Sequence, residues 1–296
     1  PLTMEDCARS AGESLTGRIR GEALCMGNIN EAETHKVKQV LERHFLDTAL
    51  PLSDAEVPVF RSMKLPTRIE AEHIFGPEVL KRTIPIVHQE LAFSETEENN
   101  AVEIILQAGS ELSLGNEGVA ILDLIGHIAY NSAFSTLRTK EQLGYIVNSN
   151  ARKTTGGGWG LSVSVQSSVA LPEQLEERIE AWLVVFRQEL EVMSPESMAM
   201  EASAVAAQYL ENETKMSQEI HRAWGEILNT ADLPVGLRTP SFDRLERLAD
   251  ELIVAETSED EETLKARKTA AQLKQRVLDF FDEHFASSSL NRRSMS

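Results

Sequence analysis

The sequence predicts an α+β fold in which a mainly antiparallel sheet carries long helices packed on one of its faces. Three strand-like runs, at residues 101–107, 145–151 and 159–166, lie mid-chain, and three glycines at 156–158 mark a hairpin turn between the last two. Long amphipathic segments at 116–130 and 172–193 have helical spacing. Strands joined by hairpins and then long helices are typical of this class. We expect these two helices on the same face of the sheet.

The run at 159–166 shows which of its side chains face the core. Leu161, Val163 and Val165 alternate with polar residues, as they do in a strand with one buried face. The polar residues, which we expect on the opposite face, are Ser162, Ser164 and Gln166.

The first ninety residues give a looser pattern. We expect, in order, a helix at 4–20, a strand at 22–26, a helix at 30–45, a linker at 51–58, and strands near 59–65 and 83–90. Asn30 and Glu33 have the spacing of a capping box at the start of the second helix. The apolar stripe of that helix is Val37, Val40, Leu41 and Phe45.

The C-terminal third is mostly helical in pattern. Ser194 and Pro195 have the residue types of an N-cap and a first helical position. Further helices are expected at 217–228 and within 242–285, where an acidic run at 256–262 reads as a solvated loop between the last two. Residues 292–296 read as the opening of a closing strand, which we expect to continue beyond Ser296.

Composition excludes several classes of function. The net charge of −18 argues against nucleic acid as a partner, because phosphate binding needs clustered Lys and Arg. No run of about 18 apolar residues is present, so we expect no membrane partner. Cys7 and Cys25 are too few for a disulfide framework, and we interpret them as a reduced, partly buried pair in a cytoplasmic protein.

The most informative stretch places Arg138 and Tyr145 seven residues apart across a helix-to-strand corner. Arg offers a fixed fork of donors and Tyr a hydroxyl on a rigid ring. Together they can hold a peptide carbonyl and steady the charge that develops when it is attacked. The alternative interpretation is structural, with an Arg on a solvated helix face and a half-buried Tyr at the start of a strand.

No metal motif accompanies this pair. A zinc peptidase of the inverzincin type needs His-x-x-Glu-His on a helix, where two imidazoles bind metal and the Glu is the general base. None of the seven histidines has Glu at +3 and His at +4, and His44 to Asp47 is the nearest approach. We therefore expect that this chain alone binds no zinc.

Residues 131–147 resemble the most characteristic segment of the C-terminal half of the insulysin family of pitrilysin-like zinc metallopeptidases. The specific core is Leu-Arg-Thr-Lys-Glu-Gln-Leu-Gly-Tyr-Ile-Val at 137–147. Looser likeness in order and spacing includes residues 22–30, 178–183 and 224–227, and the resemblance extends over roughly residues 3–296. The resemblance implies that residues 1–19 end a preceding domain or linking helix. It also implies that residues 20–296 form an insulysin-like C-terminal domain, truncated in its last strand.

The resemblance also implies roles. In the family, the N-terminal catalytic half carries zinc, and the C-terminal half closes over peptide substrates as the other shell of a chamber. Arg138 would hold the substrate backbone and Tyr145 would donate to the carbonyl oxygen. The polar strand face of Ser162, Ser164 and Gln166 would line the chamber.

Two functions follow from this resemblance. The first is the non-zinc-binding, substrate-enclosing part of a metalloendopeptidase that hydrolyses peptides, with the isolated chain inactive because it lacks the histidine motif. The alternative is a non-catalytic domain that binds peptides or stabilises a partner. The oligomeric state stays open, with a homodimer as one alternative.

Overall fold

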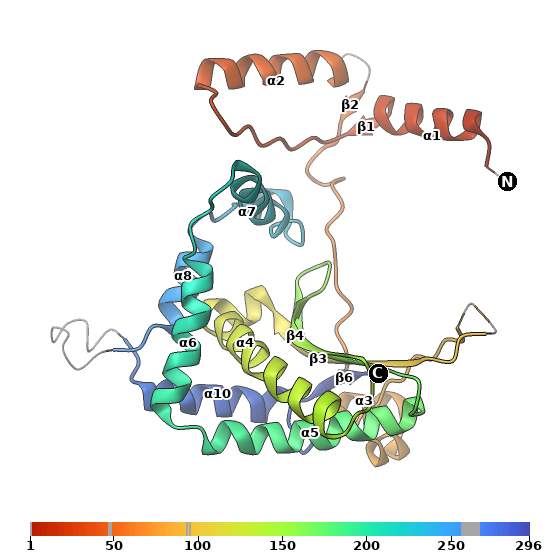
Figure 1. The fold of residues 1–296 in the computed structure, drawn as a ribbon. Coiled ribbons are helices and arrows are strands. Elements are labelled where there is room, and N and C mark those ends of the chain that lie inside the picture. Colours follow the sequence, from red (N-terminus) through yellow and green to blue (C-terminus); the bar gives the residue numbers. More distant parts are fainter. Residues whose placement is uncertain (1, 47–48, 93, 95, 256–266) are drawn as a thin grey trace. The chain divides into compact units, whose positions relative to one another are not determined.

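The computed structural model describes residues 2–46, 49–92, 94, 96–255 and 267–296 (Figure 1). The chain forms two compact units: unit 1 comprises residues 1–61 and 212–242, and unit 2 comprises residues 62–211 and 243–296. The predicted domain boundary near residue 20 therefore falls inside unit 1. No helix in the described part of the chain is long and apolar enough to cross a membrane.

Unit 1 consists of helices and two very short strands that are linked by backbone hydrogen bonds. Its elements are α1 (Met4–Thr16), β1 (Arg18–Ile19), α2 (Glu31–Leu46), β2 (Leu50–Pro51), α7 (Met216–Leu228) and the 3-10 turn η3 (Val235–Leu237). Strands β1 and β2 pair in parallel. The N–H of Phe60 donates to the carbonyl of Ala231 at 3.2 Å, which joins the two stretches of sequence that make up this unit.

The capping box of α2 forms as predicted, but its stripe is not buried. The Glu33 N–H donates to Asn30 Oδ1 at 3.0 Å, and the Asn30 N–H donates to Glu33 Oε2 at 3.0 Å. The four apolar side chains of the stripe are 38–55% exposed. Two further expectations in this unit are wrong, because residues 22–26 form no strand and Cys7 is exposed.

Unit 2 is built on an antiparallel sheet with the strand order β4-β5-β3-β6. Its strands are β3 (Asn100–Ser110), β4 (Ile146–Lys153), β5 (Gly158–Ser167) and β6 (Arg293–Met295). β3 and β5 pair over most of their length, with Val102 opposite Val165, Ile104 opposite Val163 and Leu106 opposite Leu161. The predicted closing strand is β6, which pairs with β3. The three predicted central strands are confirmed.

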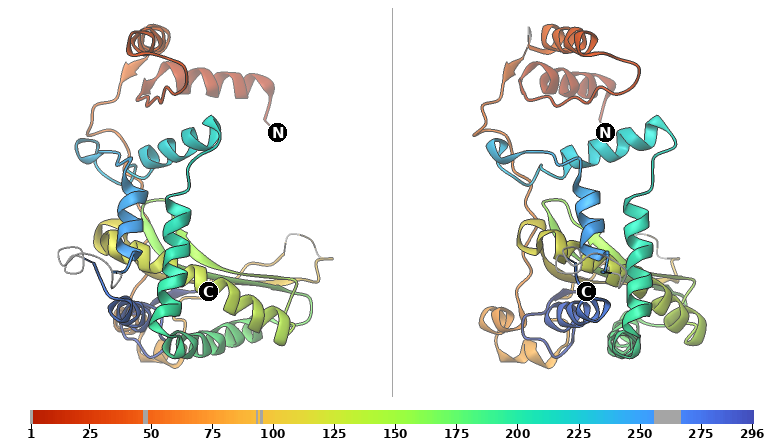
Figure 2. Two further views of the ribbon diagram at one scale, coloured as in Figure 1. Left: turned by 60° about the vertical axis from the view of Figure 1, so that its left-hand side comes forward. Right: turned by 90° about the vertical axis from the view of Figure 1, so that its left-hand side faces the viewer.

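The helices of unit 2 are α3 (Arg68–Phe75), α4 (Glu111–Ala133), α5 (Pro172–Val192), α6 (Pro195–Tyr209), α8 (Arg244–Leu252) and α10 (Ala270–His284), with the 3-10 turn η1 (Pro77–Lys81) and the π-helical turn η2 (Phe134–Lys140). Helices α4, α5 and α10 pack on the apolar face of the sheet (Figures 1 and 2). The predicted fold class and the one-sided helix packing are thus confirmed. The acidic run at 256–262 lies outside the described residues.

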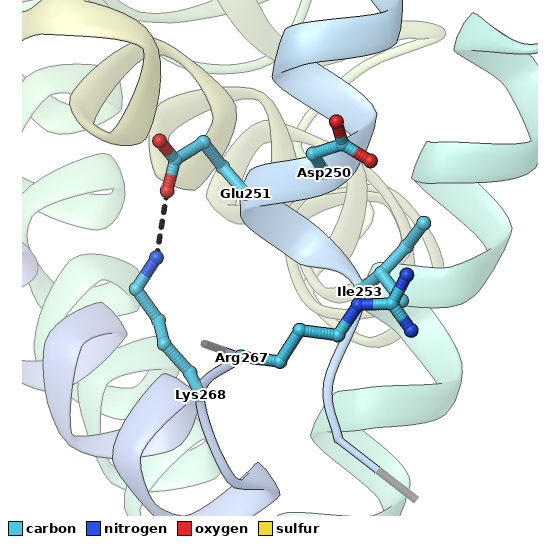
Figure 3. A pocket seen from close by; sticks show the side chains of 5 residues that line it. All are labelled: Asp250, Glu251, Ile253, Arg267 and Lys268. Carbon is cyan, nitrogen blue, oxygen red and sulfur yellow. Dashed lines mark hydrogen bonds and ion pairs between the residues drawn. The ribbon is translucent and has the colours of Figure 1, made fainter. Parts of the chain in front are cut away.

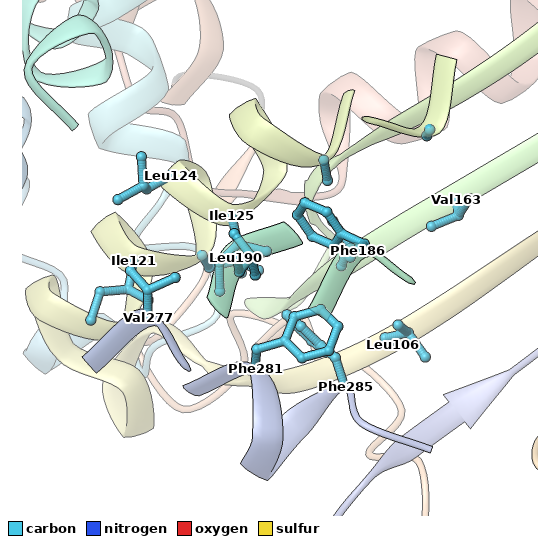
Figure 4. Close-up of a cluster of buried hydrophobic side chains, with 14 of the residues drawn as sticks. Leu106, Ile121, Leu124, Ile125, Val163, Phe186, Leu190, Val277, Phe281 and Phe285 are labelled. Carbon is cyan, nitrogen blue, oxygen red and sulfur yellow. The ribbon is translucent and has the colours of Figure 1, made fainter. Parts of the chain in front are cut away.

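The core lies between this sheet face and those helices (Figure 4). Leu106 and Val163 reach it from the strands, Phe186 from α5 and Phe281 from α10, and all four side chains are at most 1% exposed. The rings of Phe186 and Phe281 meet edge to face with centroids 5.7 Å apart. Aromatic pairs in this geometry contribute about 0.5–1.5 kcal/mol beyond their buried area.

Two strand predictions in this unit are wrong. Residues 59–65 form no strand, and within 83–90 only an isolated bridge between Ile86 and Met295 forms. Residues 63 and 65 are held by a side chain rather than by a ladder, since Gln107 Oε1 accepts from the Leu65 N–H at 2.8 Å and its Nε2 donates to the Met63 carbonyl at 2.9 Å. Helix α3, which was not predicted, follows directly.

Candidate active-site corner

The candidate site is a corner, residues 134–147, where η2 leaves the end of α4 and turns into the edge strand β4. The Glu141 N–H donates to the Thr136 carbonyl at 2.9 Å, the wider i→i−5 spacing of a π-helix. Single π-turns are rare and occur often at functional sites. Arg138 lies on this turn, and Tyr145 directly precedes β4.

The guanidinium of Arg138 lies over the faces of two aromatic rings. Its Cζ atom is 4.6 Å from the ring centroid of Phe134 and 4.9 Å from that of Tyr145. Such contacts attract the cation to the ring faces and leave the N–H groups at its edge free to donate. Within the described residues, Arg138 has no ion pair and no side-chain hydrogen bond. The rings therefore position the cation without occupying its donors.

The carboxylate nearest to Arg138 in sequence is engaged elsewhere. Glu141 accepts two hydrogen bonds from Arg178 of α5, from Nε at 2.7 Å and from Nη2 at 2.6 Å. The hydrogen bonds to Glu141 raise the pKa of Arg178. A bidentate pair of this kind fixes geometry as well as charge. It ties the corner to α5 and keeps Glu141 from neutralising Arg138.

The backbone of the corner is constrained at two positions. Gln142 has φ +53°, a conformation that non-glycine residues rarely adopt. At Gly144, a Cβ atom would lie 1.8 Å from the carbonyl oxygen of Gln166, so only glycine fits against β5. Strained residues of this kind persist where the surrounding structure holds them, and they cluster at functional sites. The constraints fix the point from which Tyr145 projects.

Tyr145 projects into solvent. Its side chain is 83% exposed, and its hydroxyl has no hydrogen-bond partner among the residues that the structure describes. Neighbouring Ile146 is 49% exposed, whereas Val147 is 7% exposed and packs on the core. The structural alternative predicted a half-buried tyrosine, whereas Tyr145 is mostly exposed.

The polar face of β5 differs from the corner because one of its side chains, Ser162, is buried and hydrogen-bonded within the fold. Ser162 is 4% exposed, and its hydroxyl donates to Glu103 Oε1 at 2.6 Å. Glu103 also pairs with Arg152 of β4. Burial alone would raise the pKa of Glu103, but the bonds from Ser162 and Arg152 outweigh it and hold that pKa below its ordinary value. Ser162 thus serves an internal network, while Ser164 and Gln166 are partly exposed.

Sequence reasoning found Arg138 and Tyr145 but missed Phe134, which contacts Arg138, and the partners of Glu141 and Ser162. Phe134 lies four residues before Arg138, and this helical spacing was the available signal. Arg178 and Glu103 come from α5 and β3, far from the corner in sequence, and no local pattern indicates them.

No cluster suited to a metal ion is present among the described residues, since no three His, Cys, Asp or Glu side chains converge. His127, for example, faces Glu201 at 3.2 Å, in a two-member pair. The described residues therefore do not fit a zinc site.

A pocket of about 420 Å³ lies elsewhere in unit 2 (Figure 3). Asp250, Glu251, Ile253, Arg267 and Lys268 line it. Lys268 Nζ donates to Glu251 Oε2 at 2.7 Å across the opening. Ligand sites are mostly apolar with a few polar groups, and this wall is mostly charged. We place no ligand there.

Comparison with known proteins adds a family context. Residues 124–224 match the family model described as PQQ synthase PqqF-like, C-terminal lobe domain 4. The matched stretch includes the whole corner and β5.

Several curated relatives match larger parts of the chain. Human insulin-degrading enzyme is 31% identical over 217 residues, covering 73% of this chain and 19% of its own length. The peroxisomal insulin-degrading enzyme-like 1 of Arabidopsis thaliana is 26% identical over all 296 residues and 26% of its own length. A Schizosaccharomyces pombe protein named as a candidate zinc protease is 31% identical over 240 residues, 81% of this chain and 22% of its own. The chain thus spans about a fifth to a quarter of the relatives it matches.

The fold is also seen in a solved structure. The crystal structure of pitrilysin superposes with a TM-score of 0.66 at 18% identity, covering 99% of this chain and 25% of the pitrilysin chain. At this level of identity the likeness shows the fold alone.

Proposed function

Because this chain carries a domain of the insulysin and pitrilysin peptidase family, we propose that it is the C-terminal, substrate-enclosing part of a zinc metalloendopeptidase that hydrolyses peptides. Zinc would be held by an N-terminal catalytic half of the same polypeptide, since the residues described here offer no metal cluster. The isolated chain would then neither bind zinc nor cleave peptides.

The observation that supports this proposal is the arrangement of Arg138 and Tyr145. A cation that lies over two rings and has no hydrogen-bond partner among the described residues keeps its N–H donors available for a peptide carbonyl. We propose that Arg138 holds the substrate backbone in this way. Because the guanidinium of Arg138 is already held in position, binding the peptide costs less entropy.

We assign the charge-stabilising role to Tyr145. Its exposed hydroxyl would donate to the carbonyl oxygen of the scissile peptide as negative charge develops there. Ser164 and Gln166, on the strand beside the corner, would contact the peptide further along, while Ser162 supports that strand from within.

The test is Tyr145→Phe in the complete polypeptide. Losing one donor to a developing oxyanion lowers turnover by about 100- to 1000-fold, and substrate affinity should change far less. The melting temperature should stay unchanged, because the hydroxyl has no partner among the described residues.

The matched control is Tyr130→Phe. Tyr130 is 46% exposed, and its ring centroid lies 6.4 Å from that of Phe134, so it belongs to the same surface without reaching Arg138. It should keep normal turnover. Wild-type turnover in Tyr145→Phe would contradict the proposed role, and an in-frame polypeptide without a His-x-x-Glu-His motif would favour the non-catalytic peptide-binding alternative.

A further inference from the structure

The chain passes between its two units at three places: between residues 61 and 62, between 211 and 212, and between 242 and 243. Near each crossing, on the side of unit 2, one side chain is tied to the body of that unit. These three side chains are Ser62, Tyr209 and Arg244. Their partners, all within unit 2, lie on helix α4 and on the hairpin of β4 and β5. Every covalent connection to unit 1 thus leads to the same helix and hairpin.

The crossing at Arg244 is held by a carboxylate that three side chains share. Arg244 Nε donates to Glu111 Oε1, and Glu111 Oε2 accepts from Lys153 Nζ at 2.9 Å and from Trp159 Nε1 at 3.3 Å. We call these four residues the crossing cluster. Burial alone would raise the pKa of Glu111, but the bonds from Lys153 and Arg244 outweigh it and lower that pKa. Glu111 is therefore ionised at neutral pH, and charge-assisted hydrogen bonds of this kind are the stronger ones.

The other two crossings are tied to the same helix and hairpin. Ser62 Oγ lies 2.9 Å from Thr154 Oγ1, and Thr154 directly follows β4. A Cβ atom at Gly158 would lie 2.6 Å from each of these two oxygens, so the end of the hairpin packs closely against Ser62. The Tyr209 hydroxyl donates to Asp123 Oδ2 on α4. The three anchors together hold α4 and the hairpin end of β4 and β5.

The same helix and strand carry the substrate corner at their opposite ends. Helix α4 runs from Glu111 into the π-helical turn that carries Arg138, and strand β4 runs from Lys153 back to the residue that follows Tyr145. The two elements are in close contact, since a Cβ atom at one glycine of α4 would lie 2.6 Å from a backbone nitrogen of β4. Packed, rigid elements of this kind carry energetic coupling between distant sites.

We infer that the crossing cluster couples unit 1 to the Arg138–Tyr145 corner, with Glu111 as the residue that positions the hairpin end of β4. A displacement of unit 1 acts on the three anchored side chains, and β4 and α4 carry it to the corner. This inference rests on the proposed function only in treating the corner as the substrate site, and it names how that site is regulated. Coupling is reciprocal, so a peptide held at the corner also changes unit 1.

The experiment uses ¹⁹F NMR on the 296-residue chain labelled with 3-fluorotyrosine. Its three tyrosines are Tyr130 near the corner, Tyr145 at the corner and Tyr209 at a crossing. Single substitutions to phenylalanine assign the three resonances. Because the readout needs neither zinc nor peptide hydrolysis, it is independent of the proposed activity.

The perturbation is Arg238→Ala in unit 1. Arg238 Nη2 donates to the Pro58 carbonyl at 3.2 Å and its Nε donates to the Leu233 carbonyl at 2.9 Å, so this arginine ties together the segments of unit 1 that lead to two of the crossings. We expect its loss to move the Tyr145 resonance by more than the linewidth. In a Glu111→Gln background the same change should move that resonance at least about threefold less, because a double-mutant cycle isolates the coupling.

The matched control is Arg9→Ala, which removes an exposed ion pair with Asp6 in α1 of the same unit and should leave the Tyr145 resonance in place. Ser62→Ala is a second and milder break, because it removes one anchor on the hairpin, and it should also reduce the response to Arg238→Ala. Unfolding of unit 1 by Arg238→Ala would itself be a displacement of unit 1, and it should still move the resonance.

The outcomes separate this inference from the proposed function. An unmoved Tyr145 resonance in Arg238→Ala would overturn the coupling, and so would equal movement with and without the Glu111 carboxylate, or equal movement in Arg9→Ala. Each of these results leaves the proposed function standing. Normal turnover of Tyr145→Phe in the complete polypeptide would instead contradict the substrate role and leave the coupling unaffected.

Discussion

The two outer strands of the sheet in unit 2 differ in whether the backbone groups on their outer side are hydrogen-bonded. At β6, the chain covers its own edge: the His88 N–H donates to the Ser296 carbonyl at 2.8 Å, and the Ser296 N–H donates to the Ile86 carbonyl at 3.0 Å. At β4, the outer backbone groups have no such partner among the described residues, and the strand opens on an exposed Tyr145.

The arginines beside the two edges also differ in whether their donors are occupied within the fold. Arg292, beside β6, is fully buried and forms a two-point ion pair with Glu180 of α5. Arg138, beside β4, is held by two rings and keeps its donors available. One edge uses its charge and backbone for stability, and the other leaves both unpaired among the described residues.

The largest effect should come from Gly144→Ala at the open edge. A Cβ atom there meets the Gln166 carbonyl oxygen at 1.8 Å, so β4 and β5 must separate, at a cost of about 1–3 kcal/mol in unfolding free energy. Urea denaturation measures this loss. Gly225→Ala, where a Cβ atom meets nothing within 4 Å, is the control and should gain about 1 kcal/mol in helix α7. Equal effects in the two variants would contradict the close packing at Gly144.

A smaller effect is expected from Ser162→Ala, which removes the hydrogen bond to Glu103. A hydrogen bond to a charged group contributes about 1.5–3 kcal/mol to the free energy of unfolding. Because Glu103 is partly exposed, we expect a loss of stability near the lower end of that range. The pKa of Glu103 is held below 4.5 in the folded state, so this stability is present above pH 4.5 and is lost as the pH falls through the folded pKa. Denaturation of both proteins at pH 7 and pH 3 should show the difference shrinking. A difference that grows in acid would contradict this assignment.

The smallest effect should come from Arg178→Ala, which releases Glu141. An exposed ion pair contributes about 0.2–1 kcal/mol, so stability changes little. The freed carboxylate then competes for Arg138 and should raise KM in the complete polypeptide by about two- to fivefold, with turnover nearly unchanged. The charge exchange Glu141→Arg with Arg178→Glu restores the pair and should lower KM again. Failure of that exchange, together with a large loss of stability, would indicate a purely structural pair.

The corner was predictable because its information is local. The spacing of Arg138 and Tyr145 and the glycine between them lie within one short segment, and the strand at 159–166 alternates clearly. The sheet and its helices followed from the same periodicity. The family resemblance added expected roles, which the geometry alone does not supply.

The remaining features depend on distant contacts. Segments 59–65 and 83–90 have strand-like residues, but Gln107 and the C-terminal strand hold them without a ladder. The stripe of α2 is apolar in sequence, although within the described residues it stays 38–55% exposed. Ser162 looked like one more polar residue on an open face, and only its contact with Glu103 of β3 shows that it is engaged. Periodicity indicates which face is apolar but not what covers it.

The most direct test of the difference between the two edges makes the same chemical change at both. Arg138→Lys and Arg292→Lys each keep the charge and lose the planar fork. In the complete polypeptide, melting temperature and turnover per folded molecule are measured for both. Arg292→Lys should lose about 2 kcal/mol or more, a fall of roughly 4–8 °C, with normal turnover per folded molecule.

Arg138→Lys should show the reverse, with a melting temperature close to that of the wild type and turnover at least about tenfold lower. Normal turnover in Arg138→Lys, or a loss of stability equal to that of Arg292→Lys, would show that Arg138 serves the fold and would contradict its assignment to the substrate.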